Sequence, residues 1–164
     1  MNQAINLSRR NLIRGRADSA LLPLRPPGAI PEALFAEQCT SCGECIEICP
    51  QRIVIKGSAG YPEVDFRQGE CTFCSRCIDS CAEGALLHEL QPPWRLELRL
   101  TDNCLAKRQV VCQTCGDACG VDAIRFRPQP GAVAIPLIDQ DVCTGCGACI
   151  AACPQDALKA VAHG

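Results

Sequence analysis

Aromatic side chains are scarce in this sequence, which holds one Trp, one Tyr and four Phe among 164 residues. Aromatic rings usually supply much of the apolar area that a small core buries. A chain of this length has room for one domain or two small ones, and its few rings fit an ordinary hydrophobic core poorly. We therefore expect something other than side chains to fill part of the interior.

The usual signatures of nucleotide binding and catalysis are also missing. No G-x-G-x-x-G sequence follows a strand and no G-x-x-x-x-G-K-[ST] loop occurs, so neither a nicotinamide, a flavin nor an NTP site is visible. The two histidines stand alone, and we interpret His88 as a strand or linker residue and His163 as a terminal one. No nucleophile is paired with a base, which predicts a protein without substrate turnover of its own.

The N-terminal segment has no long apolar run. Residues 8–13 resemble the opening of a twin-arginine export signal, but Arg14, Arg16 and Asp18 interrupt the place where an apolar region should follow. A complete export signal and a membrane span are therefore not expected. We predict a cytoplasmic protein whose thiols stay reduced and available to metal.

Cysteine, in contrast, is abundant, with 16 residues. Three quartets share the spacing C-x2-C-x2-C-x3-C, which is typical of bacterial cysteine runs that bind 4Fe-4S clusters. A further quartet has a first gap of seven residues, and no cysteine is left over. In chain order the quartets are Cys39, Cys42, Cys45 and Cys49; Cys71, Cys74, Cys77 and Cys81; Cys104, Cys112, Cys115 and Cys119; and Cys143, Cys146, Cys149 and Cys153. The sequence predicts that these residues bind four 4Fe-4S clusters.

Zinc is the main alternative for the quartets, because C-x2-C pairs also bind it. Structural zinc usually draws on two separated pairs, whereas three ligands crowd into each run here, so the spacing favours iron–sulfur clusters. Disulfides would need an oxidising compartment. The C-x3-C-x2-C loop of radical-SAM proteins is absent from the sequence.

The third quartet, "CLAKRQVVCQTCGDAC", leaves the role of Cys104 open. Gln109 stands where a regular quartet has its first cysteine, and Cys104 lies five residues earlier. A flexible loop can return the Cys104 thiolate to the same corner of a cluster at small entropic cost, and we favour this reading. In the alternative, Cys104 is a buried free thiol beside a 3Fe centre or a water-ligated iron. Lys107 and Arg108 either raise the potential of this cluster or form a solvated turn.

The pairing of quartets is also open. In two-cluster ferredoxins the last cysteine of each run binds the other run's cluster, which would pair quartets one with two and three with four. A nested pairing of one with four and two with three has mild support, because only quartets one and four end in Cys-Pro.

The first cysteines recur every 32 to 39 residues, which indicates an internal repeat. The stretches "RIVIKGSAGYPEVDF" and "AIRFRPQPGAVAIPLID" predict hairpins, and "RLELRL" predicts a strand after Pro92 and Pro93. We expect an α+β fold of tandem bacterial-type (4Fe-4S) dicluster ferredoxin units, with short antiparallel hairpins and short helices around the clusters. The predicted divisions are a basic N-terminal tail (1–29), a unit with quartets one and two (30–91) and a unit with quartets three and four (92–164).

Charge separates the tail from the rest of the chain. The formal charge of −2 becomes about −10 if each cluster with its thiolates carries about −2, which disfavours nucleic acid as the main partner. The tail is basic, and its candidate partner-binding residues are Arg9, Arg10, Arg14 and Arg16. We expect deletion of residues 1–28 to leave the clusters intact and to weaken partner binding.

Because cluster ligation contributes folding free energy, the apo chain should be largely disordered.

Four cysteine quartets, a stretched third quartet, the N-terminal "SRRNLIRGR" and the chain length together resemble the NapF family of ferredoxin-type accessory proteins of periplasmic nitrate reductase systems. The resemblance implies a cytoplasmic iron–sulfur protein that binds the catalytic molybdenum subunit before its export. It further implies a role in maturation, by supplying electrons or by helping to insert that subunit's 4Fe-4S centre, with the 16 cysteines as cluster ligands. The alternative is a general electron carrier that serves soluble redox partner proteins.

Overall fold

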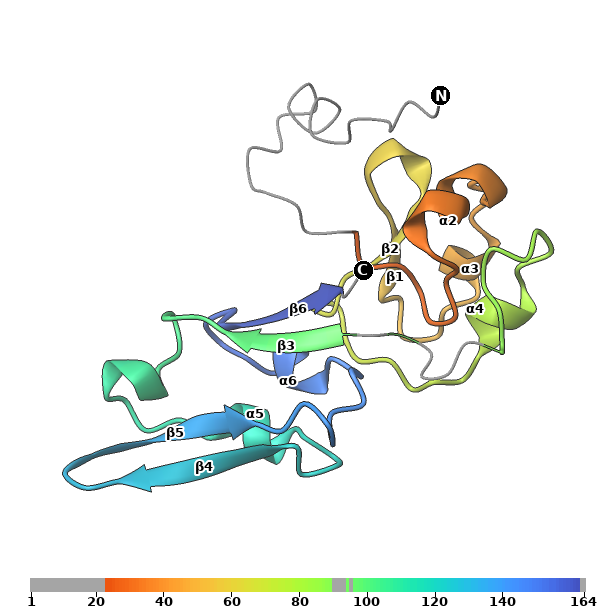
Figure 1. Cartoon of the computed structure of the whole chain (residues 1–164). Coiled ribbons are helices and arrows are strands. Elements are labelled where there is room, and N and C mark those ends of the chain that lie inside the picture. The colour runs from red at the N-terminus through yellow and green to blue at the C-terminus, as the bar shows by residue number, and fades with distance from the viewer. Residues whose placement is uncertain (1–22, 90–93, 95, 163–164) are drawn as a thin grey trace, which may run out of the picture.

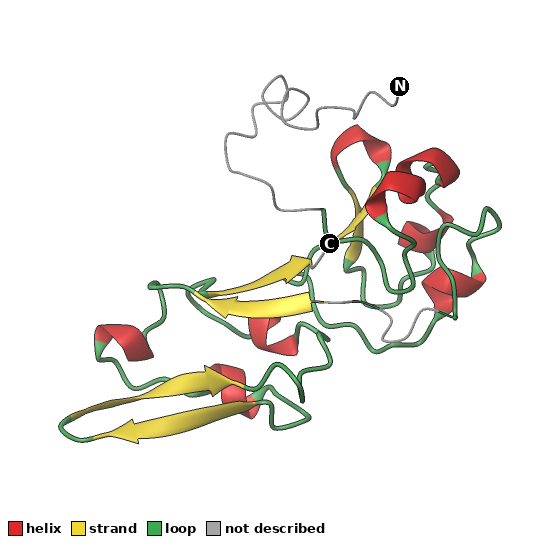
Figure 2. Cartoon of the chain, in the orientation of Figure 1, coloured by secondary structure: helices red, strands yellow, loops and turns green. Residues whose placement is uncertain are grey.

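The computed structural model describes residues 23–89, 94 and 96–162. These residues form two lobes that follow one another along the chain (Figure 1). The first lobe comprises residues 23–89, and the second lobe comprises residue 94 and residues 96–162. Short helices and strands are joined by long stretches of loop in both lobes (Figure 2).

The elements are few and short. In the first lobe they are helix α2 (Glu32–Gln38), helix α3 (Glu44–Glu47), strand β1 (Val54–Lys56), the 3-10 turn η1 (Ser58–Gly60), strand β2 (Pro62–Val64) and helix α4 (Arg76–Asp79). In the second lobe they are strand β3 (Leu96–Leu100), the 3-10 turn η2 (Ala106–Arg108), helix α5 (Thr114–Asp117), strands β4 (Ile124–Gln129) and β5 (Ala132–Ile138), helix α6 (Ala148–Ala151) and strand β6 (Leu158–Ala162). This small mixture of helices and strands agrees with the expected α+β class.

Three two-stranded antiparallel sheets are present in the described part of the chain. Strand β1 pairs with β2 and β4 pairs with β5, which confirms both predicted hairpins. The predicted "RLELRL" strand is present as β3, and its partner is β6 at the far end of the lobe's sequence, with Leu100 opposite Leu158. Local pattern predicted the two hairpins, whereas the β3–β6 pair joins segments about sixty residues apart in the sequence.

Each cysteine quartet is followed by the same turn. The third residue after the last cysteine has a left-handed backbone, with φ between 47° and 69°. Its N–H donates to the carbonyl of that last cysteine at 3.1 to 3.4 Å. These four residues are Arg52, Gly84, Asp122 and Asp156. The turn therefore repeats in the backbone although its side chains differ.

Two buried apolar residues come directly after each turn. The first of them is Ile53, Ala85, Ala123 or Ala157, and the second is Val54, Leu86, Ile124 or Leu158. The carbonyl of the first residue accepts a hydrogen bond from a distant N–H at 2.8 to 3.1 Å in every repeat. The donors, in the same order, are Asp65, Ile30, Asp139 and Thr101. Each cysteine loop is thus closed against the apolar core of its lobe.

The last residues of the predicted basic tail pack on the first lobe. Arg25 donates from Nε and Nη2 to the Glu32 carboxylate at 2.8 and 2.6 Å, and its guanidinium lies over the rings of Phe35 and Tyr61. Ala29 forms an antiparallel bridge with Leu86. Residues 23–29 therefore contribute to the first lobe, and a truncation meant to remove only the tail should end before residue 23.

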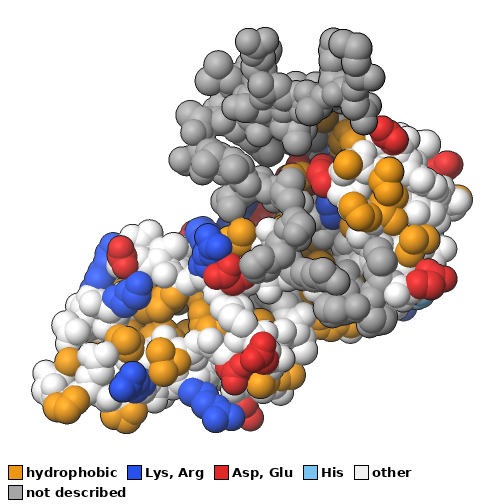
Figure 3. All heavy atoms as spheres, viewed as in Figure 1, with side chains coloured by type: hydrophobic (Ala, Val, Ile, Leu, Met, Phe, Trp, Pro, Cys, Tyr) orange, Lys and Arg blue, Asp and Glu red, His pale blue; other side chains and the backbone are white. Residues whose placement is uncertain are grey.

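Charged side chains are distributed unevenly over the visible surface. On the face shown in Figure 3, Asp and Glu side chains lie around the edge of the first lobe, whereas most of the Lys and Arg side chains in view lie on the second lobe. Apolar side chains are visible between them on both lobes. No helix among residues 23–89, 94 and 96–162 is long and apolar enough to cross a membrane.

Candidate metal centres

The first lobe brings its eight cysteines together as two groups of four. Site I consists of Cys39, Cys42, Cys45 and Cys81, and site II consists of Cys49, Cys71, Cys74 and Cys77. Burial and the neighbouring thiols of the other three site I cysteines raise the pKa of Cys45 to about 11. All four site II cysteines line one cavity. The last cysteine of each quartet thus lies with the other quartet's first three.

The second lobe repeats this exchange. Site III consists of Cys104, Cys112, Cys115 and Cys153, which line one small cavity. Site IV consists of Cys119, Cys143, Cys146 and Cys149, which line another. Burial and nearby thiols, Cys143 and Cys146 first, raise the pKa of Cys149 to about 12. Quartets one and two therefore lie together, as do three and four, and the nested arrangement is not the geometry of this fold.

A short helix positions the third cysteine of every quartet. Cys45 lies in α3, Cys77 in α4, Cys115 in α5 and Cys149 in α6. In quartets one, two and four, the residue that follows the second cysteine precedes the helix and has a left-handed backbone. These residues are Gly43, Ser75 and Gly147. The reversal turns the chain so that the second and third thiols point into one site.

In the third quartet, a longer loop brings the first cysteine, Cys104, to its site. Residues 106–108 form the 3-10 turn η2, and Gln109 has a left-handed backbone with φ of 63°. The Gln109 side-chain oxygen accepts a hydrogen bond from the N–H of Val133 at 3.2 Å, which ties the loop to β5. The seven-residue segment between Cys104 and Cys112 therefore folds back on itself, and it brings Cys104 into the cavity that Cys112 and Cys115 line.

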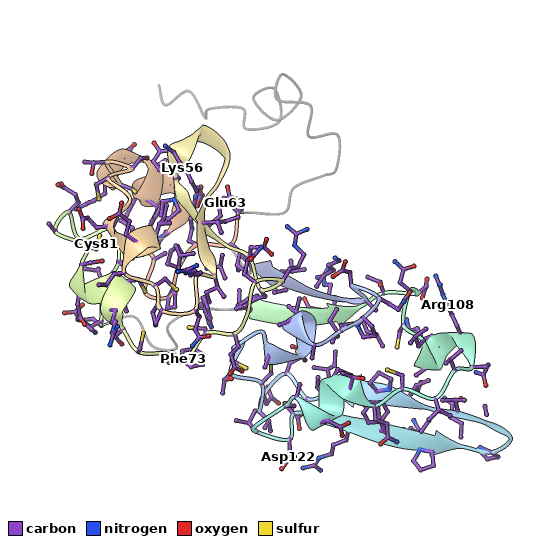
Figure 4. All side chains as sticks on the ribbon, turned by 180° about the vertical axis from the view of Figure 1, so that it is seen from behind. Lys56, Glu63, Phe73, Cys81, Arg108 and Asp122 are labelled. Atoms are coloured by element: carbon purple, nitrogen blue, oxygen red, sulfur yellow. The ribbon has the colours of Figure 1, made fainter. Side chains whose placement is uncertain are left out.

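Basic side chains of this loop are held by the residues just before it. Lys107 Nζ lies 3.0 Å from Asp102 Oδ1, and Arg108 Nη2 donates to Asn103 Oδ1 at 2.8 Å. Figure 4 shows Arg108 on the part of the second lobe that points away from the first lobe. Of the two interpretations of these side chains, the local contacts fit an exposed basic turn that also closes the loop around Cys104.

Each site offers four thiols, most of them partly buried; Cys42 in site I and Cys74 in site II are exposed. Burial, followed by the charges of nearby thiols, raises the pKa of Cys77 to about 12 and that of Cys115 to about 11. Buried thiolates need compensation by positive charge, which coordinated iron supplies. Some thiols also accept hydrogen bonds, as when the N–H of Ala157 donates to Cys153 Sγ at 3.3 Å. Such bonds to cluster ligands tune reduction potential.

The donor set fits a 4Fe-4S cluster. Four thiolates, each bound to a different iron, complete the ligand shell of a cubane. A mononuclear ion instead draws its ligands tightly together, with Zn–S bonds of about 2.3 Å. Within the described ranges, no group of three or more His, Cys, Asp or Glu side chains is arranged around such a single-ion site. Four thiols are the donor set that a cubane requires.

Other predicted site residues are placed differently. Arg9, Arg10, Arg14 and Arg16 lie outside the described residues, as does His163. His88 lies in a turn, where its Nε2 is 2.8 Å from Asp79 Oδ1. Sequence reasoning gave no role to Trp94, whose ring packs against Phe66 and Phe73 between the lobes. Its position after the Pro-rich boundary segment was the only signal that could have pointed to it.

Family models of iron–sulfur domains match two stretches of the chain. The family model of a 4Fe-4S dicluster domain matches residues 38–86, and that of a 4Fe-4S binding domain matches residues 136–159. Quartets one and two lie in the first match and quartet four lies in the second. The third quartet lies outside these two ranges.

Among individual proteins, the chain is similar to the ferredoxin-type protein NapF of Haemophilus influenzae, with 42% identity over 163 residues and 93% of each chain covered. It is 38% identical to the ferredoxin-type protein NapF of Escherichia coli K12 over 156 residues, with 95% of each chain covered. The ferredoxin-type protein NapG of Escherichia coli K12 is 33% identical over 159 residues, which cover 83% of this chain and 69% of NapG.

Proposed function

Since the chain belongs to the NapF family of ferredoxin-type iron–sulfur proteins, we propose that it binds four 4Fe-4S clusters and assists maturation of the catalytic molybdenum subunit of periplasmic nitrate reductase. It acts in the cytoplasm, before that subunit is exported. The contribution is electron supply or insertion of the subunit's own 4Fe-4S centre. The protein is an accessory protein and has no substrate turnover of its own.

The observation that carries this proposal is the grouping of all 16 cysteines into four sites of four, two in each lobe. In tandem dicluster units, each site takes three thiolates from one quartet and one from its partner quartet. Cys104 serves as a full ligand of site III. The four sites thus account for every cysteine in the chain, which supports four clusters.

The chain's own residues bind the clusters, shield them from water and tune their reduction potentials. When bound, each cluster takes up or releases one electron, which is the chemistry that the fold itself lacks. The short helices hold the third thiol of each quartet in the buried part of its site, and Cys45 and Cys149 are buried. Cys42 and Cys74 are exposed, so sites I and II are open to a partner at their second thiol. Backbone N–H groups such as that of Phe73, 3.4 Å from Cys71 Sγ, stabilise the charged ligands.

A general electron carrier between soluble redox enzymes is the second candidate function. It is favoured by the nearness of sites II and IV, because cysteines of both line one cavity between the lobes. Four sites in contact from lobe to lobe suit electron passage, whereas an assembly factor needs only one exposed site that can give up its cluster.

The test mixes anaerobically purified, iron-57-labelled protein with the apo form of the catalytic molybdenum subunit. For the maturation role we expect a stable complex, followed either by transfer of the label to the subunit or by reoxidation of the reduced donor. A complex that does not form, together with fast electron exchange with unrelated soluble reductases, would favour the general carrier instead. Mössbauer spectra of the two separated proteins measure where the iron has gone.

The arginine tail is tested in the same mixture. Replacement of Arg9, Arg10, Arg14 and Arg16 by Gln should weaken the complex without changing iron content, because these side chains lie before the packed segment that begins at residue 23. Arg67→Gln is a matched control, since Arg67 is an exposed arginine of the first lobe that pairs with Asp65. Equal affinity in all three proteins would show that the tail does not contribute to docking.

A further inference from the structure

The cysteine loops of sites II and IV meet at the contact between the lobes. The N–H of Cys71 donates to the carbonyl of Cys146 at 2.7 Å, a backbone hydrogen bond between one site and the other. Cys71, Cys74 and Cys143 line the same cavity of about 690 Å³. Burial is the main cause that raises the pKa of Cys71 to about 11, and the thiol of Cys146 contributes to it. Sites II and IV are therefore neighbours although they belong to different lobes.

An indole ring spans this contact. Trp94 packs edge-on against Phe66 and Phe73, with ring centroids 5.5 and 5.9 Å apart. Its Nε1 donates to the carbonyl of Thr144 at 3.3 Å. Phe73 directly precedes Cys74 of site II, and Thr144 directly follows Cys143 of site IV. Figure 4 shows Phe73 where the first lobe adjoins the second. Trp94 thus touches both cysteine loops at once.

Two glycines of the site IV loop let the aromatic rings approach closely. A Cβ atom on Gly145 would lie 2.9 Å from Trp94 Nε1, and one on Gly147 would overlap the ring of Phe66. Gly147 precedes α6, the helix that carries Cys149. Phe66 itself is almost fully buried. The Phe66 ring of the first lobe therefore packs directly against the backbone of the site IV loop.

We propose that Phe66, Trp94, Gly145 and Gly147 form a joint that fixes the separation of sites II and IV across the two lobes. These are positioning residues, because they act on the cysteine loops and do not ligate iron. The inference rests on the proposed function, since it requires both sites to hold clusters. Electron exchange between two centres depends on their separation, so a fixed joint makes the two lobes one redox unit instead of two independent ones.

The first variant is Gly147→Ala, and the chain supplies a matched control in Gly43→Ala. Both glycines follow the second cysteine of their quartets and precede the helix with the third, and their φ values are 83° and 89°. The backbone strain of the added methyl group is therefore alike. Only Gly147 has a ring against it, because the space around Gly43 is open within 4 Å. A difference between the two variants reports on the joint.

The measurement is electron paramagnetic resonance of the dithionite-reduced proteins, in which magnetic interaction between clusters reports their separation, together with iron content. We expect the wild type and Gly43→Ala to share an interaction between the lobes, and Gly147→Ala to lose it at unchanged iron. Trp94→Leu should lose it too, and Trp94→Phe, which keeps a ring, should retain it. If Gly147→Ala also loses iron, the proposal is judged by the comparison of Trp94→Leu with Trp94→Phe.

Identical spectra for the wild type and Trp94→Leu, at equal iron content, would refute the proposal that this joint fixes the separation of the two sites. So would an equal loss of interaction in Gly43→Ala, because that glycine does not touch the other lobe. A wild-type protein with far less iron than four clusters need would count against the proposed function and not against the positioning role. The iron assay and the spectra thus separate the two failures.

Discussion

Single residues matter most in the third quartet, where one thiol arrives through a loop that the other quartets lack. Cys104 lines the site III cavity with Cys112, Cys115 and Cys153. After burial, its thiol is the largest of the neighbouring charges that raise the pKa of Cys115 to about 11. A bystander thiol elsewhere in the lobe would not have this effect. This position supports the proposal that Cys104 is the fourth ligand of site III.

Substitution of this residue tests ligation directly. We expect Cys104→Ser to lower the iron content from about 16 per chain to between about 12 and 15, because site III loses either one iron or its whole cluster. Iron and acid-labile sulfide assays measure the loss, and Mössbauer spectra identify a 3Fe centre. Val111→Ser is the control, since Val111 belongs to the same loop and its side chain is 78% exposed. Unchanged iron in Cys104→Ser would refute ligation.

At the scale of elements, strand β3 has a hydrogen-bond partner outside its two-stranded sheet. Strand β3 pairs with β6, and it is also held by a side chain. The Gln140 amide donates from Nε2 to the Leu98 carbonyl at 2.8 Å and accepts from the Leu98 N–H at 3.1 Å. One side chain thus occupies the place of a neighbouring strand. Because Gln140 lies shortly before Cys143, it also connects β3 to the site IV loop.

Removal of this amide should loosen β3. Gln140→Ala loses two hydrogen bonds worth about 0.5 to 1.5 kcal/mol each, so we expect the free energy of unfolding to fall by about 1 to 3 kcal/mol. Thermal unfolding followed by circular dichroism and by cluster absorbance measures the change. Gln129→Ala, at the exposed end of β4, should leave the midpoint unchanged. A midpoint for Gln140→Ala equal to that of the control would show that the pairing contributes nothing.

For the whole molecule, the small apolar core and the four cysteine sites form one interior. Buried residues that follow quartets one, three and four line the same cavities as the thiols of sites II, IV and III. Without iron, these thiols would surround space that neither ring nor aliphatic side chain fills. The short helices, four residues each around the sites, are also far below the length at which a helix is stable by itself. We therefore expect the fold to depend on ligation.

We predict that the apo chain loses most of its secondary structure. Anaerobic removal of iron with a chelator should collapse the far-ultraviolet circular dichroism signal, because ligation free energy is folding free energy in small metal-dependent domains. Readdition of iron and sulfide should restore the signal, which separates reversible unfolding from aggregation. An apo spectrum that matches that of the loaded protein would contradict this prediction.

The sequence by itself determined the features that depend on near neighbours. The C-x2-C-x2-C-x3-C spacing indicated iron–sulfur chemistry, and alternating apolar residues around glycine-containing turns predicted the hairpins β1–β2 and β4–β5. Both signals lie within a few residues of chain, where backbone geometry alone fixes which side chains share a face. The tail arginines remain a prediction, since they lie outside the described residues.

Only the tertiary structure decided which distant segments meet. It placed Cys81 with quartet one and Cys153 with quartet three, folded the loop that returns Cys104, and paired β3 with β6. It also brought Trp94 against both cysteine loops. These contacts join residues far apart in the chain, and each forms only because the surrounding lobes pack around buried apolar residues. The spacing had left two quartet pairings open and had given β3 no partner, because long-range pairing is selected by the free energy of the whole fold.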